Sequence, residues 1–139
     1  MTDDMTQVLA ERGRERCELE VSRAAEGRTQ LEALYAWLDP ERLTARDRDK
    51  IRSFAVGRRQ EAVGKLNDLA RDARTVRKIG ADLERTAADR VPDPVPDTQP
   101  ALREARALAK ALREATLMYR ALIDACDAIV SRLGDDLDA

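Results

Sequence analysis

The most constraining feature of this sequence is an unbroken heptad pattern over residues 101–133. Apolar side chains recur there at alternating spacings of four and three residues. They are Ala101, Ala105, Leu108, Leu112, Ala115, Tyr119, Leu122, Cys126, Ile129 and Leu133. This spacing places them on one face of an α-helix, whereas a half-buried β-strand would need an alternation of period two. We predict a helix that packs lengthwise against other helices.

Two further segments carry apolar seams of the same kind. One contains Ala62, Leu66, Leu69, Ala73, Val76, Gly80, Leu83 and Ala87, and the other contains Ala10, Gly13, Cys17, Ala24, Gly27, Leu31, Leu34 and Leu38. Proline cannot continue a helix and separates the segments, at Pro40 and within residues 91–100. We predict helices over about residues 3–38, 41–90 and 99–133, with a stiff proline-rich connector at 91–100 and an acidic tail at 134–139. Asp39 is a candidate N-cap for the second helix, and Thr44 marks a second possible start.

The predicted fold is all-α, an elongated antiparallel bundle of three long helices with coiled-coil-like seams, in a single helical domain over residues 1–139. Charged residues make up 37% of the chain and aromatic residues only 3%, a balance typical of long helices rather than sheets. Upstream of Ala55 the second seam would contain Arg48 and Arg52. We therefore infer a break or bend near Gly57, which would give four helices.

Composition also limits the chemistry. The chain has no histidine, so the commonest general base and metal ligand are absent. Its glycines are scattered singly rather than gathered in a phosphate-binding loop, and no serine lies in a Gly-x-Ser-x-Gly turn. We therefore expect no enzymatic activity, no cofactor, no metal site and no small-molecule substrate.

Four residues are predicted to lie in the core rather than to act in a site. Cys17 and Cys126 are expected to be buried, reduced seam residues, because their predicted heights in the bundle differ too much for a disulfide. Tyr119 lies on a seam and Trp37 lies next to one, so each is expected to pack in the core.

The chain is expected to act in the cytoplasm of a bacterium. No stretch approaches twenty apolar residues, and the acidic start of the chain lacks the apolar core of a signal peptide. Arginine far outnumbers lysine, which is typical of a GC-rich bacterial genome. We expect no membrane contact.

A candidate partner surface lies on the third helix. Four sizeable apolar side chains fall beyond its seam: Leu117, Met118, Ile123 and Val130. A three-helix monomer cannot easily cover all four, so they predict contact with a second copy or with another protein. The alternative is that the second segment folds back as two helices and covers them.

A basic segment supports a second hypothesis for the function. Residues 41–90 carry more basic than acidic side chains, whereas both flanking segments are net acidic. The densest stretch contains Arg42, Arg46, Arg48, Lys50, Arg52, Arg58 and Arg59. Such a stretch can bind nucleic acid. However, no aromatic residues interleave with the basic ones beyond residue 60, where i, i+4 pairs neutralise the charge.

We therefore predict a non-enzymatic protein–protein interaction module that acts by helix–helix hydrophobic docking, as a homo-oligomer or in a hetero-complex. Adaptors, assembly factors and export chaperones act in this way. In length, helix count and acidic balance the chain is similar to the small helical chaperones of bacterial flagellar and type III export. The alternative is a nucleic-acid-associated protein that binds through residues 42–59.

Overall fold

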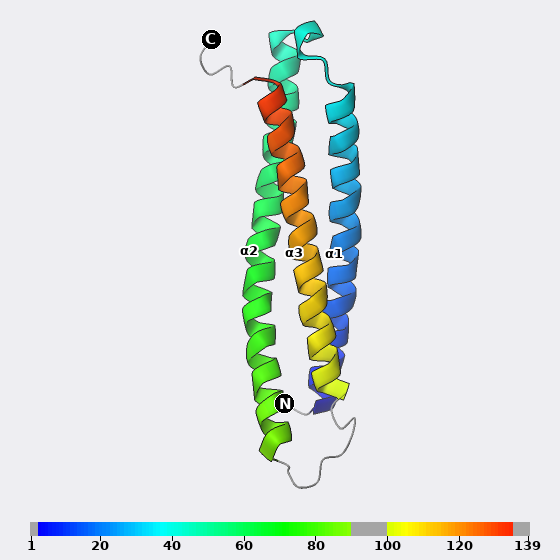
Figure 1. Ribbon diagram of the computed structural model, residues 1–139, viewed down its shortest axis with the longest axis vertical. Helices are drawn as coiled ribbons and strands as arrows, with labels where there is room; N and C mark the ends of the chain where they lie inside the picture. The colour runs from blue at the N-terminus through cyan, green and yellow to red at the C-terminus, as the bar shows by residue number, and fades with distance from the viewer. Residues whose placement is uncertain (1–2, 90–99, 135–139) are drawn as a thin grey trace. The chain divides into compact units, whose positions relative to one another are not determined.

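The computed structural model describes residues 3–89 and 100–134, which form an all-α three-helix bundle (Figure 1). Its helices are α1 (Asp3–Trp37), α2 (Ala45–Asp89) and α3 (Pro100–Arg132), with a 3-10 turn, η1, at Pro40–Arg42. The described residues contain no strand. Of the predicted connector at 91–100 the structure describes only Pro100, which is the first residue of α3, and of the predicted tail at 134–139 it describes only Gly134.

The α1–α2 connection uses the second of the two predicted helix starts. Asp39 makes no side-chain capping bond, and residues 40–42 form only the short turn η1. The Oγ1 atom of Thr44 accepts a hydrogen bond from the backbone N–H of Asp47 at 3.1 Å, so α2 begins after Thr44. At its far end, α3 is closed by Gly134, whose φ of 79° lies in the left-handed region that favours glycine.

The expected break near Gly57 was wrong, because α2 is one continuous helix. Its buried residues Ala55, Ala62, Leu69, Val76 and Leu83 recur every seven residues straight through that point.

The arginines that suggested the break do lie on the seam, but their long side chains reach past the core. The guanidinium of Arg48 donates to the carbonyl oxygen of Pro40 at 2.6 Å. That of Arg52 donates to the carbonyl oxygen of Gly134 at 3.1 Å. Their charged ends thus find polar partners, and the helix need not break.

By its internal contacts the chain divides into two compact units. The first contains Met1–Val21 and Asp68–Thr116. In this unit α1 approaches α3 closely, because a Cβ atom added at Gly13 would lie 3.1 Å from Leu108. An ion pair of 3.2 Å joins Arg14 Nε to Glu104 Oε2 beside the same contact.

The second unit contains Ser22–Asn67 and Leu117–Ala139. It holds the largest fully buried side chains among the described residues: Leu31, Leu38, Cys126, Ile129 and Leu133. The ends of α1 and α3 are joined by Arg132, whose Nε donates to the carbonyl oxygen of Leu38 at 3.2 Å. The Arg132 guanidinium also lies 4.9 Å from the ring centroid of Tyr35.

The core prediction was right for three of its four residues. Tyr119 is buried, and Cys17 and Cys126 are buried free thiols. Trp37 was misplaced, because 71% of it is exposed to solvent. It is the last residue of α1 and lies one position before the seam residue Leu38, which is buried in its place.

Candidate protein-docking groove

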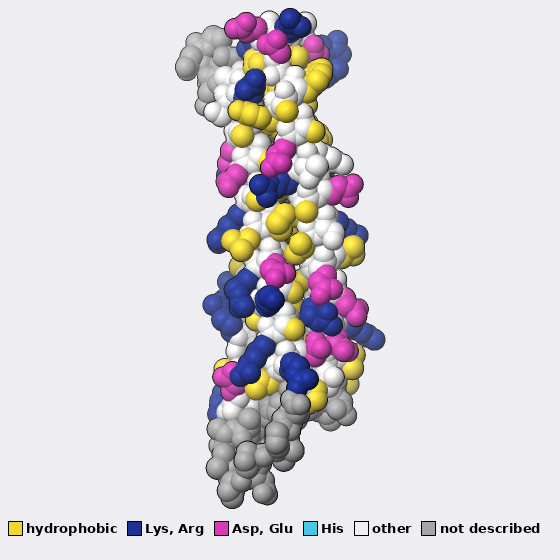
Figure 2. All heavy atoms as spheres, turned by 45° about the vertical axis from the view of Figure 1, so that its right-hand side comes forward, with side chains coloured by type: hydrophobic (Ala, Val, Ile, Leu, Met, Phe, Trp, Pro, Cys, Tyr) yellow, Lys and Arg dark blue, Asp and Glu magenta, His cyan; other side chains and the backbone are white. Residues whose placement is uncertain are grey.

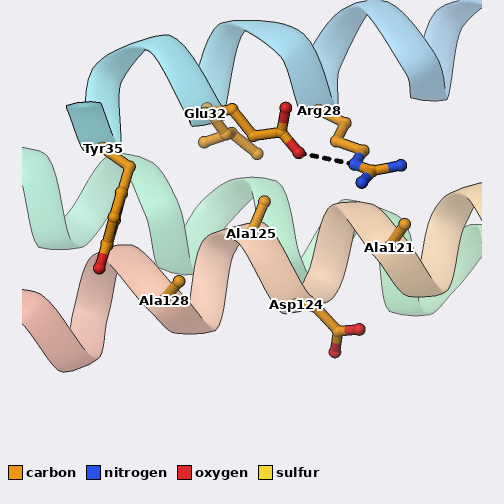
Figure 3. A pocket seen from close by; sticks show the side chains of 8 residues that line it. Arg28, Glu32, Tyr35, Ala121, Asp124, Ala125 and Ala128 are labelled. Atoms are coloured by element: carbon orange, nitrogen blue, oxygen red, sulfur yellow. Dashed lines mark hydrogen bonds and ion pairs between the residues drawn. The ribbon is translucent and has the colours of Figure 1, made fainter. Parts of the chain in front are cut away.

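The second unit contains a groove between α1 and α3, here called the α1–α3 groove, with a volume of about 280 Å³. Four residues of α1 and four of α3 line it: Arg28, Leu31, Glu32, Tyr35, Ala121, Asp124, Ala125 and Ala128. Figure 3 shows the Tyr35 side chain reaching from α1 toward α3 beside Ala128, whereas Asp124 points away from α1. Ala121 and Ala125 lie on the α3 side that faces α1 (Figure 3).

The groove exists because α3 presents small side chains along this flank. Ala121, Ala125 and Ala128 follow at spacings of four and three residues, so they lie along one side of the helix. An alanine extends only one carbon from the backbone and leaves the space beside Tyr35 open. In the first unit, the Arg14–Glu104 ion pair lies alongside the contact of the same two helices.

Charged side chains form the rim of the groove. Arg28 Nε lies 2.8 Å from Glu32 Oε1, an i, i+4 ion pair that satisfies both groups within α1. The floor between these charged side chains is apolar. A floor of alanine and leucine with a charged rim fits an apolar side chain from another helix.

The four predicted partner residues are not brought onto one face of α3. Leu117 is 62% exposed, whereas Met118, Ile123 and Val130 are half-buried. At about 100° per residue, Met118 lies about 140° around the helix from Ile123. Three helices therefore cover much of these three side chains, which leaves Leu117 as the large apolar residue projecting from this part of α3.

The predicted basic segment is largely paired within the protein. Arg59 Nε lies 2.8 Å from Asp127 Oδ1 on α3, and Arg58 Nη1 lies 3.6 Å from Glu61 Oε2. Arg42 and Arg52 have ion-pair partners within three residues, Asp39 and Asp49. Arg48 donates to a backbone carbonyl.

Only two members of the basic segment are exposed without an ion pair to any described residue: Arg46 and Lys50, one turn apart on α2. Further along α2, Arg71 and Arg85 pair with Asp68 and Asp82 at i, i+3 spacing. On the face shown in Figure 2, hydrophobic side chains lie among charged side chains of both signs.

The two cysteines are poor candidates for reactive thiols. Burial raises the pKa of both thiols, and the nearby carboxylates Asp72 and Asp127 raise the pKa of Cys17 and Cys126, respectively. A thiol with a raised pKa stays protonated and is a weak nucleophile at neutral pH. Both side chains serve as packing groups.

Sequence reasoning missed the groove itself. The available signal was the run of Ala121, Ala125 and Ala128 outside the predicted seam, together with Tyr35 beside the seam of α1. The pattern of one helix does not reveal which side chain its neighbour places opposite, so the empty volume appears only when α1 and α3 are packed.

Within the described ranges, no helix is long and apolar enough to cross a membrane. Nor do any three cysteine or carboxylate side chains among these residues gather as the ligands of a metal ion would. Comparisons with protein-family models, with curated proteins and with solved structures find no match.

Proposed function

We propose that this protein is a non-enzymatic protein–protein interaction module that binds by helix–helix hydrophobic docking in the α1–α3 groove. The observation that carries the proposal is an open groove with an apolar floor, lined by Leu31, Ala121 and Ala125. The exposed Leu117 lies one turn before Ala121 on the same helix. Exposed apolar surface of this kind is typical of protein-binding sites.

The mechanism is burial of an apolar helix face, as an adaptor, assembly factor or export chaperone would use. A docked helix would place an apolar side chain against the alanines, while Arg28, Glu32 and Asp124 at the rim would stay in water. Rim charges of this kind govern the choice of partner more than the affinity. The oligomer or complex would act in the bacterial cytoplasm, a setting that suits the two free thiols.

The test compares two leucine substitutions. Leu117→Glu places a charge beside the groove, and Leu19→Glu makes the same change at a leucine of α1 that is 50% exposed and lies in the first unit. We expect Leu117→Glu to weaken association by at least about tenfold, because it removes an apolar contact and adds a charge that would have to be desolvated. Leu19→Glu should leave association unchanged.

The readouts are solution mass by sedimentation velocity and the set of proteins retained by the tagged chain in its native cell. Far-UV circular dichroism shows whether both variants keep their helices. The proposal fails if the two variants associate equally well, or if the wild-type chain neither self-associates nor retains a protein.

Nucleic-acid association through the start of α2 is the second candidate, supported by the exposed, neighbouring cations Arg46 and Lys50. The effect of salt on binding separates the two functions. Binding to phosphates weakens steeply as salt rises, whereas docking in the groove should weaken far less, because apolar contact supplies most of its affinity. The double substitution Arg46→Ala with Lys50→Ala should abolish binding to duplex DNA if this candidate is correct, and should leave protein docking intact.

A further inference from the structure

The second unit carries both a knob and a hole. The knob is Leu117, which is 62% exposed, and the hole is the α1–α3 groove, whose α3 wall begins at Ala121. Leu117 and all the residues that line the groove belong to the second unit. A surface that offers a knob and a hole together is suited to an isologous contact, in which each copy fills the hole of the other.

We propose that the occupant of the groove is a second copy of this chain, with the two α3 helices antiparallel about a two-fold axis at Ala121. This inference rests on the proposed function, because it names the partner of the same groove. Antiparallel pairing about Ala121 sets the residue four positions before it opposite the residue four positions after it. Leu117 of each copy then meets Ala125 in the groove of the other.

The charges beside the axis favour this pairing. Arg120 precedes Ala121 by one residue and Asp124 follows it by three, so both lie on the same flank of α3. Both are exposed, and neither has an ion pair within the described part of the chain. The antiparallel arrangement brings Arg120 of one copy within a turn of Asp124 of the other, and the symmetry forms this pair twice. A parallel arrangement in register would instead set Arg120 against Arg120, which is repulsive.

The contact is short. From Leu117 to Ala128 the helix rises only about 17 Å. An interface of this length is at the small end of specific protein contacts, so we expect a weak dimer that forms at micromolar to millimolar concentration.

The sharpest test exchanges the charges. In a dimer of the Arg120→Asp variant, the new aspartate of each copy would face Asp124 of the other. In a dimer of the Asp124→Arg variant, the new arginine of each copy would face Arg120 of the other. Because like charges repel, each single variant should dimerise about tenfold more weakly than the wild type. The double variant Arg120→Asp with Asp124→Arg should regain the dimer. An equal mixture of the two single variants should form a heterodimer, since each supplies the charges that the other needs. Sedimentation velocity at low salt measures these four samples and the wild type.

A thiol cross-link tests the axis independently. Two Ala121→Cys chains would place their new thiols next to each other across the axis, so mild oxidation should give a covalent dimer. The matched control is Ser131→Cys, an exposed position on the same helix whose two copies would be about 30 Å apart. Cys17 and Cys126 are buried and should not compete.

Three outcomes overturn the inference: a wild-type chain that stays monomeric at about 1 mM, a charge-exchanged double variant that does not regain the dimer, or equal cross-linking at positions 121 and 131. The failures are distinguishable. In one outcome the wild-type chain is monomeric but binds a different protein, and this binding is lost in Leu117→Glu and kept in Leu19→Glu. That outcome refutes self-docking and leaves the proposed function standing. A monomer that retains no protein refutes both.

Discussion

At the scale of single residues, the contact of Gly27 with Leu122 measures how tightly α1 packs on α3 in the second unit. A Cβ atom added at Gly27 would lie 2.9 Å from Leu122 Cδ1 and 3.1 Å from Arg58 Nη2. A carbon atom cannot approach that closely without displacing its neighbour. The glycine therefore sets the distance between the helices, although it lowers the intrinsic stability of α1.

This contact predicts opposite effects for two glycine substitutions. Gly64→Ala should raise the free energy of unfolding by about 0.5–1 kcal/mol, because nothing lies within 4 Å of the added carbon and alanine favours helix. Gly27→Ala should lower the free energy of unfolding by about 1–3 kcal/mol, because overpacking outweighs the gain in helix propensity. Urea unfolding measures both. A stabilised Gly27→Ala variant would show that α1 and α3 can move apart freely.

Seam leucines and projecting leucines should also differ. Leu122 and Leu69 are buried, so Leu122→Ala and Leu69→Ala should each cost about 2–5 kcal/mol of unfolding free energy. Leu117→Ala should change the unfolding free energy by less than about 0.5 kcal/mol in the monomer, since its side chain already faces water. Thermal and urea unfolding at low protein concentration measure the three free energies of unfolding. An equal loss of stability in all three variants would contradict the helix register.

The sequence located buried seam residues well but placed Trp37 wrongly. Heptad spacing directly predicts which side chains share one face of a helix. In the structure, every described residue of the three seams is buried or half-buried. Trp37 lies at the border of that face. Whether a border residue is covered depends on the rotation of the neighbouring helix and on the path of the turn after it, and neither can be read from α1 alone.

At the scale of elements, α2 shows why a charged residue on a seam does not have to end a helix. The heptad column of α2 continues upstream from Ala62 through Ala55 to Arg48. The side chain of Arg48 is long enough to carry its charge to the carbonyl of Pro40, outside the apolar contact. Sequence reasoning treated the arginine as a core residue and therefore expected a break.

Continuity of α2 through Gly57 predicts that its backbone is equally protected on both sides of that residue. The amides of residues 55–60 should exchange with deuterium as slowly as those of the turns on either side, because each bonds within one uninterrupted helix. Hydrogen exchange followed by NMR gives the rates residue by residue. Fast exchange confined to the turn around Gly57 would support the four-helix alternative instead.

At the scale of the whole molecule, the two units differ in what fills their cores. The described core of the first unit contains Ala10, Cys17, Leu69, Val76, Leu83, Ala101, Ala105, Ala111, Leu112 and Ala115, of which half are alanine. The five largest fully buried side chains all belong to the second unit. Alanine buries little apolar area, so the first unit should be the less stable of the two.

Each unit contains one buried thiol, which makes this difference measurable. Cys17 reports on the first unit and Cys126 on the second. In a low concentration of urea, Cys17 should be alkylated at least about tenfold faster than Cys126, because local opening of the alanine-rich unit costs less free energy. Mass spectrometry of peptides from the alkylated chain gives the two rates. Equal rates at every urea concentration would mean that the two units open as one.

Photo-cross-linking in the native cell tests most directly whether a helix docks in the α1–α3 groove. A photo-reactive amino acid at position 128, which is exposed and lines the groove, should give a cross-linked species of defined mass. The same group at position 70, an exposed alanine of α2, should give none. Cross-linking at 128 that disappears on Leu117→Glu is the predicted result. No cross-link at 128, or the same cross-links at both positions, would contradict docking in the groove.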